Sequence, residues 1–332
     1  MTIISRHNLS NFEVKELGNQ GRYQELEEIV FSYLSLNKTR KYAVKELAKK
    51  PEEYIKTLIN LLTDYDDEVQ IEAMKGIKKL KKKVVQNYDN LILPVLTDVF
   101  NSNNERLKRE ALKLSNRLED KVRVDLLIDV FEETIDEVLL EEIVINLAEI
   151  EDDEVKYHVK NYMESYIING GRNRCWAIMA LGQIKAYDKI LLLRRIIKDK
   201  NEDFKNRKSA LFALEDLKDG RAIGIILKAT EDNELKDVAK ETIPQWILNF
   251  GYQDSMALQT DLESDERDLF ISAVFSLDCK EYLKNPDLLL KCLKDQNYFV
   301  RDIAECKLSI LCEEYGEELV RDNFPEEVLK EI

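Results

Sequence analysis

Histidine is almost absent from this sequence, which contains 2 histidines among 332 residues. His7 lies in the N-terminal segment and His158 follows an acidic run, so there is no His-x-x-x-His pair that could bind zinc. Neither a Gly-x-Ser-x-Gly nucleophile motif nor a Gly-rich nucleotide loop occurs. The sequence therefore predicts a protein without enzymatic activity, cofactor or metal site.

Glycine and proline are also scarce, with 10 and 5 copies, whereas 35% of the residues are charged and 44% are apolar. This composition suits long surface helices and is unfavourable for all-β or disordered chains. No run of about 18 apolar residues occurs that could span a bilayer, and the first residues lack the apolar core of a signal peptide. We expect an all-α cytoplasmic protein with no membrane association.

The five cysteines form an odd set without a Cys-x-x-Cys pair. Such a set fits reduced, mostly buried thiols better than a disulfide or zinc framework. The cysteines are Cys175, Cys279, Cys292, Cys306 and Cys312.

The stretch of residues 172–230 contains one pattern twice. Five residues recur with an offset of 33: Arg174, Ala177, Ala180, Leu181 and Ile184 return as Arg207, Ala210, Ala213, Leu214 and Leu217. Self-similarity at this period is typical of a solenoid built from helical pairs.

The same pattern predicts nine inner helices, each centred on a small or apolar residue. An apolar residue stands four positions after nearly every centre and four positions before several of them. This spacing places the apolar residues on one helical face. A helix that packs on both its pair-mate and the next repeat can approach closely only where its side chain is short, so most centres are alanine. The centres are Ala43, Ala73, Ala111, Ile143, Ala177, Ala210, Ala239, Ala273 and Ala304.

Helix starts are also marked, because a short polar residue that can cap a helix stands seven positions before most centres. These predicted caps are Asp66, Asn104, Asp136, Asp203, Asp232, Glu266 and Asn297. Outer helices are expected between the inner ones, over residues 22–35, 51–62, 87–100, 121–134, 153–168, 187–199, 221–230, 254–262 and 286–293.

Two of the inner helices, with the patterns Asp66-x-x-Val69-x-x-x-Ala73 and Val300-Arg301-x-x-Ala304-x-x-x-Leu308, resemble HEAT repeats. Residues 174–184 resemble the short HEAT-like repeat first named for phycobilisome lyases, and residues 219–223 resemble the start of the outer helix in that family. The resemblance covers about residues 22–312 and implies a right-handed α-solenoid of about nine HEAT-like helical pairs. It also implies that Arg174 belongs to a ladder of residues that connects successive repeats.

The ends of the array should be capped. Residues 1–21 form an N-terminal capping segment whose helix begins at the capping box of Ser10 and Glu13, and residues 313–332 form an acidic C-terminal cap whose last helix begins at Asn323. Pro94 and Pro244 lie within predicted helices and should bend or break them. Pro244 marks a joint of the array near residues 244–254.

The net charge of −15 is distributed in blocks. Residues 1–123 carry 23 basic and 19 acidic residues, giving +4, and residues 124–155, the acidic panel, carry 13 acidic and no basic residues. Residues 156–208, the basic panel, carry 13 basic and 5 acidic residues, giving +8, and the remainder sums to −14. The panels are either ordinary solvated surface or binding surfaces for a partner of opposite charge.

Within the panels, exposed helix positions supply the candidate partner-binding residues. In the basic panel the candidates combine guanidinium and ammonium groups with one indole: Arg172, Trp176, Arg194, Arg195, Arg207 and Lys208. In the acidic panel they are Glu141, Glu142 and Glu149.

The leading hypothesis is a non-catalytic scaffold or adaptor, possessing an inner-helix face that binds a charged protein partner and regulates or inhibits it. A second hypothesis is a HEAT-like DNA glycosylase or another nucleic-acid-binding protein. The isoelectric point near 4.9 argues against it, because phosphate contacts dominate affinity for DNA. A third, suggested only by the repeat type, is a phycobilisome lyase-like bilin carrier. The oligomeric state and the partner are not specified by the sequence.

Overall fold

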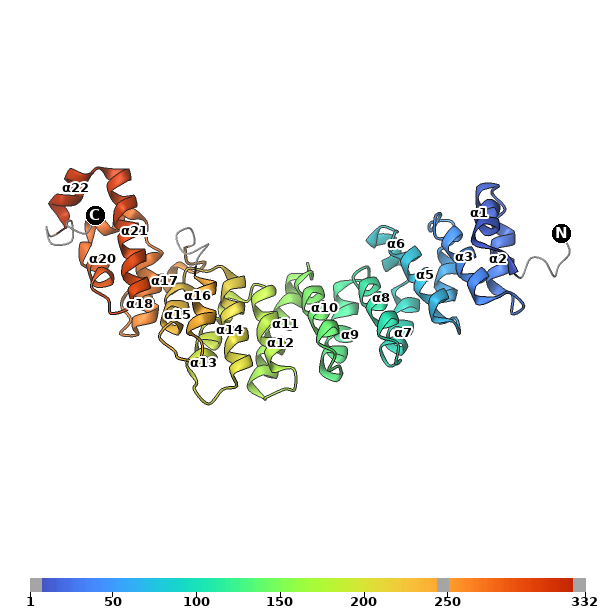
Figure 1. Ribbon diagram of the computed structural model, residues 1–332, viewed down its shortest axis with the longest axis horizontal. Helices are drawn as coiled ribbons and strands as arrows, with labels where there is room; N and C mark the ends of the chain where they lie inside the picture. The colour runs from blue at the N-terminus through green and yellow to red at the C-terminus, as the bar shows by residue number, and fades with distance from the viewer. Residues whose placement is uncertain (1–7, 244–250, 325–332) are drawn as a thin grey trace. The chain divides into compact units, whose positions relative to one another are not determined.

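The structure, a computed structural model, describes residues 8–243 and 251–324, and within these ranges every regular element is helical (Figure 1). The chain is an all-α solenoid of HEAT-like helical pairs. The α-helices are α1 Asn11–Asn19, α2 Tyr23–Phe31, α3 Asn37–Leu47, α4 Ile55–Asn60, α5 Asp67–Ile77, α6 Lys82–Gln86, α7 Asp89–Phe100, α8 Glu105–Ser115, α9 Asp120–Glu133, α10 Glu137–Ala148, α11 Asp153–Ile168, α12 Arg174–Gln183, α13 Ile190–Lys198, α14 Phe204–Leu217, α15 Ala222–Ala229, α16 Lys236–Thr242, α17 Ser255–Leu262, α18 Arg267–Phe275, α19 Cys279–Lys284, α20 Pro286–Leu293, α21 Tyr298–Tyr315 and α22 Glu317–Asn323.

The nine predicted inner helices are confirmed as α3, α5, α8, α10, α12, α14, α16, α18 and α21. Every predicted centre is fully buried, with 0% of its surface exposed. The small centre therefore lies where helices approach most closely. At Gly182, one turn beyond the centre of α12, an added Cβ would lie 2.6 Å from the Cα of Ala213 on α14.

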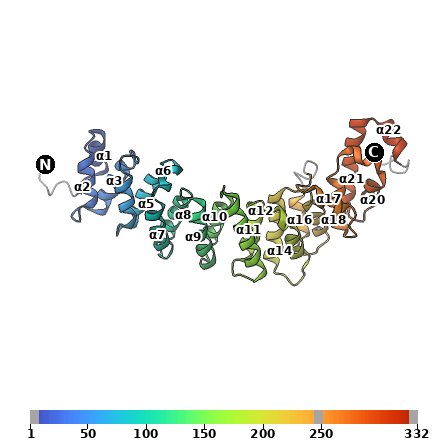
Figure 2. The same cartoon turned by 180° about the vertical axis from the view of Figure 1, so that it is seen from behind.

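The chain divides into two compact units, Met1–Val159 (unit 1) and Lys160–Ile332 (unit 2). In unit 1 each outer helix packs on the inner helix that follows it, so that α2 lies on α3, α4 on α5, α7 on α8 and α9 on α10. The inner helices α3, α5, α8 and α10 pack on one another in that order, which can be followed from both sides in Figures 1 and 2. Helix α1 packs on α2 and α3, and begins at the predicted capping box of Ser10 and Glu13.

Unit 2 begins with the same stacking, since α12 packs on α14 and α14 packs on α16. Helix α16 has only 7 residues, and the next inner helix, α18, packs on the outer helix α15. The two helices touch at Gly224, whose N–H donates to the Ser272 hydroxyl at 2.8 Å. A Cβ at Gly224 would lie 1.8 Å from the carbonyl oxygen of Asp268, so only glycine permits this contact.

Most predicted helix caps are confirmed, because the side chains of Asp66, Asn104, Asp136, Asp203 and Asn297 accept hydrogen bonds from first-turn amides. Two predicted caps behave differently. The carboxylate of Asp232 accepts from the amides of Glu234 and Leu235 before α16 begins. Glu266, whose side chain is longer than those of the preferred caps, makes no capping hydrogen bond.

Several details differ from the sequence predictions. Helix α7 continues through Pro94, whose exposed ring leaves the buried Ile92 and Leu96 packed on either side. Asn323 is the last residue of α22, and the helix predicted to begin there extends into residues 325–332, which lie outside the described part of the chain. The short helices α6 and α19 were not predicted.

The predicted joint remains a prediction, since residues 244–250, including Pro244, lie outside the described part of the chain. The three-part domain division also remains a prediction. The boundary between the compact units lies elsewhere, at Val159 within α11.

None of the five cysteines forms a disulfide, but the prediction that most are buried is wrong: only Cys292 is buried, and Cys306 is exposed. Among the described residues, no helix has both the length and the apolar character needed to cross a membrane.

Candidate protein-binding surface

Arginines connect successive helical pairs within each unit. Arg40, Arg174 and Arg207 stand three residues before an inner-helix centre, and each donates to a carbonyl of the preceding outer helix and to a carboxylate in the turn before the next inner helix. For Arg207 these partners are the Ile197 carbonyl at 3.1 Å, Glu234 at 2.6 Å and Asp232. The equivalent partners are Val30 and Asp64 for Arg40, and Ile167 and Glu202 for Arg174. These contacts form the predicted arginine ladder.

Nearly half of the cations of the basic panel are paired with carboxylates of unit 2. Six of its cations form ion pairs with acidic side chains of the same unit, several of them far along the chain. The pairs are Arg174 with Glu202, Lys189 with Glu164, Arg194 with Glu266 and Asp268, Lys198 with Glu266, Lys200 with Asp232, and Arg207 with Asp232 and Glu234. The charge blocks seen along the sequence thus become internal ion pairs in the fold.

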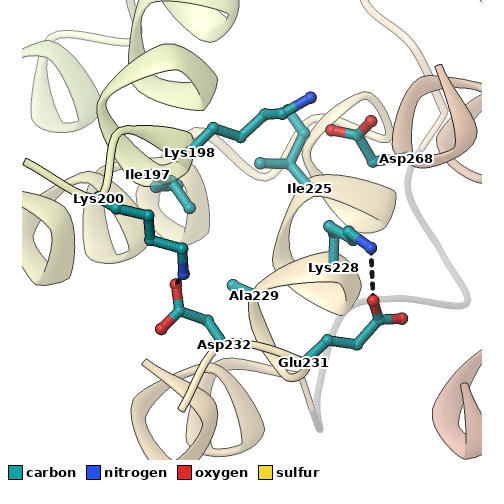
Figure 3. A pocket seen from close by; sticks show the side chains of 9 residues that line it. All are labelled: Ile197, Lys198, Lys200, Ile225, Lys228, Ala229, Glu231, Asp232 and Asp268. Atoms are coloured by element: carbon teal, nitrogen blue, oxygen red, sulfur yellow. Dashed lines mark hydrogen bonds and ion pairs between the residues drawn. The ribbon is translucent and has the colours of Figure 1, made fainter. Parts of the chain in front are cut away.

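A pocket of about 260 Å³ between α13, α15 and α18 illustrates this pairing (Figure 3). Ile197, Ile225 and Ala229 form part of its lining, and three lysines surround them. Lys200 pairs with Asp232, Lys228 with Glu231 at 2.5 Å, and Lys198 with Glu266 at 3.1 Å. The pocket therefore offers no unpaired ammonium group to an anion.

The pKa of the Asp232 carboxyl group is lowered by its contacts with Lys200 and Arg207. Burial of this carboxylate acts to raise its pKa, but hydrogen bonds from Lys200, from the Glu234 amide and from Arg207 lower it to about 2. The carboxylate is therefore ionised throughout the physiological range, and it is committed to contacts within unit 2.

Three residues of the predicted basic site contact other parts of unit 2. Arg207 has 0% exposure, so its assignment to a binding surface is wrong: the guanidinium belongs to the arginine ladder. Arg194 is held by Asp268 and Glu266. Lys208 lies over the ring of Phe212, with its Nζ 5.4 Å from the ring centroid.

Only part of that predicted site remains available. Arg172 and Arg195 are exposed and form no ion pair among the described residues. Trp176 is half-buried on α12, and within the described ranges no guanidinium stacks on its ring. The aromatic-plus-guanidinium surface is therefore not assembled as a unit.

The acidic panel shows the opposite behaviour. The exposed carboxylates of Asp125, Asp129 and Glu141 form no ion pair in the part of the chain that the structure describes. Glu154 pairs with Lys121 at 3.3 Å, but both side chains are strongly exposed, at 84% and 62%. This pair contributes little, and the panel keeps most of its negative charge.

On α10 the acidic residues combine with apolar ones in a single stripe. Val138, Glu141, Glu142, Ile145 and Glu149, here called the α10 stripe, follow the spacing i, i+3, i+4, i+7 and i+11, which places them on one helical face. Val138 and Ile145 are 44% and 46% exposed, and Glu141 and Glu149 are also exposed. Glu149 accepts a hydrogen bond from the Asn116 amide at 2.8 Å. The stripe therefore presents both apolar and anionic groups to a partner.

The acidic residues of α10 lower the stability of the helix. Its last turn has no basic residue, and Glu149 occupies the C-cap, where the helix dipole disfavours negative charge by about 0.3–1 kcal/mol. Glu137 and Glu141 are four residues apart, a spacing that adds like-charge repulsion. One carboxylate oxygen of Glu142 is buried without a hydrogen-bond partner.

Val138 and Ile145 were not predicted as partner-binding residues, although their positions relative to the buried register of α10 indicate that they are exposed. The buried residues of α10 include Leu139, Ile143 and Leu147, which follow the inner-helix spacing. The two exposed apolar residues lie outside that register, at five positions before and two after the centre.

A second polar site, at the start of α15, is a structural network. The Asp219 carboxylate accepts from the Arg221 and Gln253 amides, and Asp261 accepts from the Arg221 guanidinium and, at 2.9 Å, from the Tyr252 hydroxyl. Burial raises the pKa values of both Asp219 and Tyr252. These groups satisfy one another. No cluster of three metal-ligating side chains occurs within the described ranges.

No protein-family profile and no curated protein matches this sequence. Solved structures with a similar fold include a mutant form of the karyopherin Kap121p, at 14% identity and a TM-score of 0.44, over 95% of this chain and 35% of that chain. The same karyopherin bound to the SUMO protease Ulp1p gives a TM-score of 0.42 at 14% identity, over 92% and 34%.

A structure concerning tubulin recruitment by microtubule polymerases with TOG domain arrays gives a TM-score of 0.30 at 11% identity, over 97% of this chain and 83% of that chain. This chain spans about a third of the length of the karyopherin chains. These similarities concern the helical fold alone.

Proposed function

We propose that the protein is a non-catalytic scaffold that binds a partner protein through the α10 stripe. The partner segment carries basic residues interleaved with apolar ones, in a helix or an extended strand that follows α10. Glu141 and Glu149 attract the cations, and Val138 and Ile145 supply apolar contact area. The observation that carries the proposal is the exposed stripe itself, in which acidic and apolar side chains alternate on one inner helix.

The contrast between the two charge panels supports this choice of surface. Cations of the basic panel are paired inside unit 2, and Arg207 is fully buried. Glu141 and Glu149, the exposed carboxylates of the α10 stripe, form no ion pairs within the described chain. Charges that lack internal partners remain free to steer a partner of opposite sign. The lack of disulfides among the five cysteines is compatible with a reducing, cytoplasmic setting.

A synthetic amphipathic peptide of lysine and leucine, with leucine at positions i, i+4 and i+7, is a suitable probe. We expect the whole chain to bind it, as measured by fluorescence anisotropy. The double variant Glu141→Gln, Glu149→Gln should bind about fivefold more weakly at low salt, because each lost exposed ion pair contributes roughly 0.2–1 kcal/mol. The difference should shrink at high salt as the charges are screened.

The matched control removes the same charge from the neighbouring outer helix, in the double variant Asp125→Asn, Asp129→Asn. Both of these carboxylates are exposed on α9. The control should bind the peptide like wild type. Equal losses in the two double variants would assign the binding to net charge, and equal affinity of the α10 variant and wild type at all salt concentrations would overturn the proposal.

The other hypotheses rest on weaker support. A DNA glycosylase or another nucleic-acid-binding protein needs a free basic surface, and six of the thirteen cations of the basic panel are held in internal ion pairs. The phycobilisome-lyase subtype and its bilin-carrier role remain predictions, which absorption of visible light by the purified protein would test.

A further inference from the structure

The turn between α2 and α3 can be located in Figure 1. It and the residues that flank it expose a run of apolar side chains. Phe31, Tyr33, Leu34 and Leu36 are 50%, 92%, 73% and 52% exposed. Tyr65, which is 62% exposed, extends the run from the turn before α5. We call these five residues the N-terminal patch.

Tyr65 lies beside the first turn of α3, next to the turn that carries the other four residues of the patch. The Tyr65 hydroxyl donates to the Asn37 side-chain oxygen at 2.9 Å, one residue beyond Leu36. The Arg40 guanidinium lies over the Tyr65 ring, with its carbon 4.6 Å from the ring centroid. These contacts hold Tyr65 beside the first turn of α3. The patch therefore belongs to the fixed framework of the first two inner helices.

The exposed area of the patch is close to what a stable protein interface uses. With roughly 180 Å² for each fully exposed side chain of this size, the five residues present about 600 Å² of apolar surface. Monomeric proteins rarely expose more than 300–600 Å² in one patch. A standard interface buries about 800 Å² per partner, of which roughly two thirds is apolar at its core.

The charge around the patch favours a second copy of this chain as its occupant. Residues 31–36 contain no charged side chain, in a chain where 35% of residues are charged. The patch also lies within residues 1–123, where 23 basic and 19 acidic residues sum to +4, in contrast to the net charge of −15. Two copies can meet here without the like-charge repulsion that opposes contact between the acidic segments.

We propose that the N-terminal patch is a self-association surface, and that two copies of the chain form a symmetric dimer by packing their patches together. Symmetry requires the same residues on both sides, so Tyr33 and Leu34 of one copy pack against aromatic and aliphatic side chains of the other. This contact is separate from the α10 stripe and does not depend on its proposed function.

Sedimentation equilibrium of the whole chain, from low micromolar to several hundred micromolar concentration, tests the proposal. Wild type should show a monomer–dimer equilibrium. The double variant Tyr33→Ser, Leu34→Ser should weaken the association by roughly 100-fold, because both side chains lie at the most exposed part of the patch. Its fold should be preserved, since neither side chain is buried.

Two matched variants complete the design. Met256→Ser removes an 80% exposed apolar side chain from α17 in unit 2 and should leave the association unchanged. Tyr65→Phe removes the hydrogen bond to Asn37 but keeps the ring, and should still dimerise. A wild-type chain that remains monomeric over the whole range, or a Tyr33, Leu34 double variant that dimerises like wild type, would overturn the proposal. Peptide binding by the α10 stripe is unaffected by either result.

Discussion

Replacing Arg207 with alanine removes the most completely buried cation of the arginine ladder. Its guanidinium is 0% exposed and donates to the Ile197 carbonyl, to Asp232 and to Glu234. The change removes the side chain that links α14 to α13 and to the turn before α16. It also leaves the Asp232 carboxylate, whose side chain is 9% exposed, with one cation fewer.

The expected loss of stability follows from the burial of these groups. Removing one partner of a buried ion pair costs about 3–5 kcal/mol. Lys200 still pairs with Asp232 in the variant, so we expect a loss near the lower limit, about 3 kcal/mol.

The pH dependence gives an independent measure. The folded-state pKa of Asp232 is about 2, below its ordinary value of about 3.9. A lowered acid pKa stabilises the fold above pH ~4, by about 2–3 kcal/mol here, and this stabilisation is lost as the pH falls towards 2. The pKa of Asp232 should rise in the Arg207→Ala variant, so that acid removes less stability from it than from wild type.

Hydrogen exchange read by mass spectrometry is the appropriate assay, because repeat proteins open locally and a single unfolding free energy is poorly defined. Amides of α13 and α14 should exchange about 100-fold faster, the rate expected for a 3 kcal/mol loss. The control is Arg195→Ala, which removes an exposed arginine of α13 that has no ion pair among the described residues. Equal exchange in the two variants would refute the assignment of Arg207 to a structural ladder.

Three further predictions concern packing and thiol reactivity. Gly224→Ala should lower the melting temperature, with a cost of at least 1–3 kcal/mol, because its Cβ would lie 1.8 Å from a backbone oxygen of α18; Gly251→Ala, where a Cβ meets nothing within 4 Å, should melt like wild type, and an unchanged melting temperature in both would contradict the packing of α15 on α18. Ala210→Glu should cost several kcal/mol by placing a charge in the fully buried centre of α14, and wild-type hydrogen exchange in α13 to α15 would contradict the repeat alignment. Burial raises the pKa of Cys292 to about 12, so iodoacetamide at pH 8 should label the exposed Cys306 first, as peptide mapping can verify; preferential labelling of Cys292 would contradict its burial.

The fold was predictable because its determinants are local and repeated. The spacing of Ala177 and Ala210 established the period, and polar residues such as Asp66 and Asn297 marked where helices begin. The core and capping signals of each helix lie within one or two helical turns, and the offset of 33 repeats them along the chain. The packing of α18 on α15 was not predictable, because it depends on a close approach of Gly224 to residues more than forty positions away.

The candidate site was only partly predictable, because ion pairing is decided by tertiary structure. Arg194 and Asp268 are 74 residues apart and pair in the fold, so a basic block in the sequence gave no free basic surface. Arg174 and Arg207 occupy equivalent repeat positions. A consistent reading of the repeat would have assigned both to the ladder. Glu141 was predicted from charge, whereas the exposure of Ile145 required the fold.

Hydrogen exchange of wild type, measured with and without the lysine–leucine peptide, shows directly whether the peptide binds at the α10 stripe. At low salt, we expect the amides of α10, Glu137–Ala148, to exchange more slowly when the peptide is bound. Amides of α13, Ile190–Lys198, which carries paired cations of the basic panel, should exchange at the same rate in both states. Protection confined to α13, or bound peptide that leaves the amides of α10 unprotected, would rule out the α10 stripe as the binding surface.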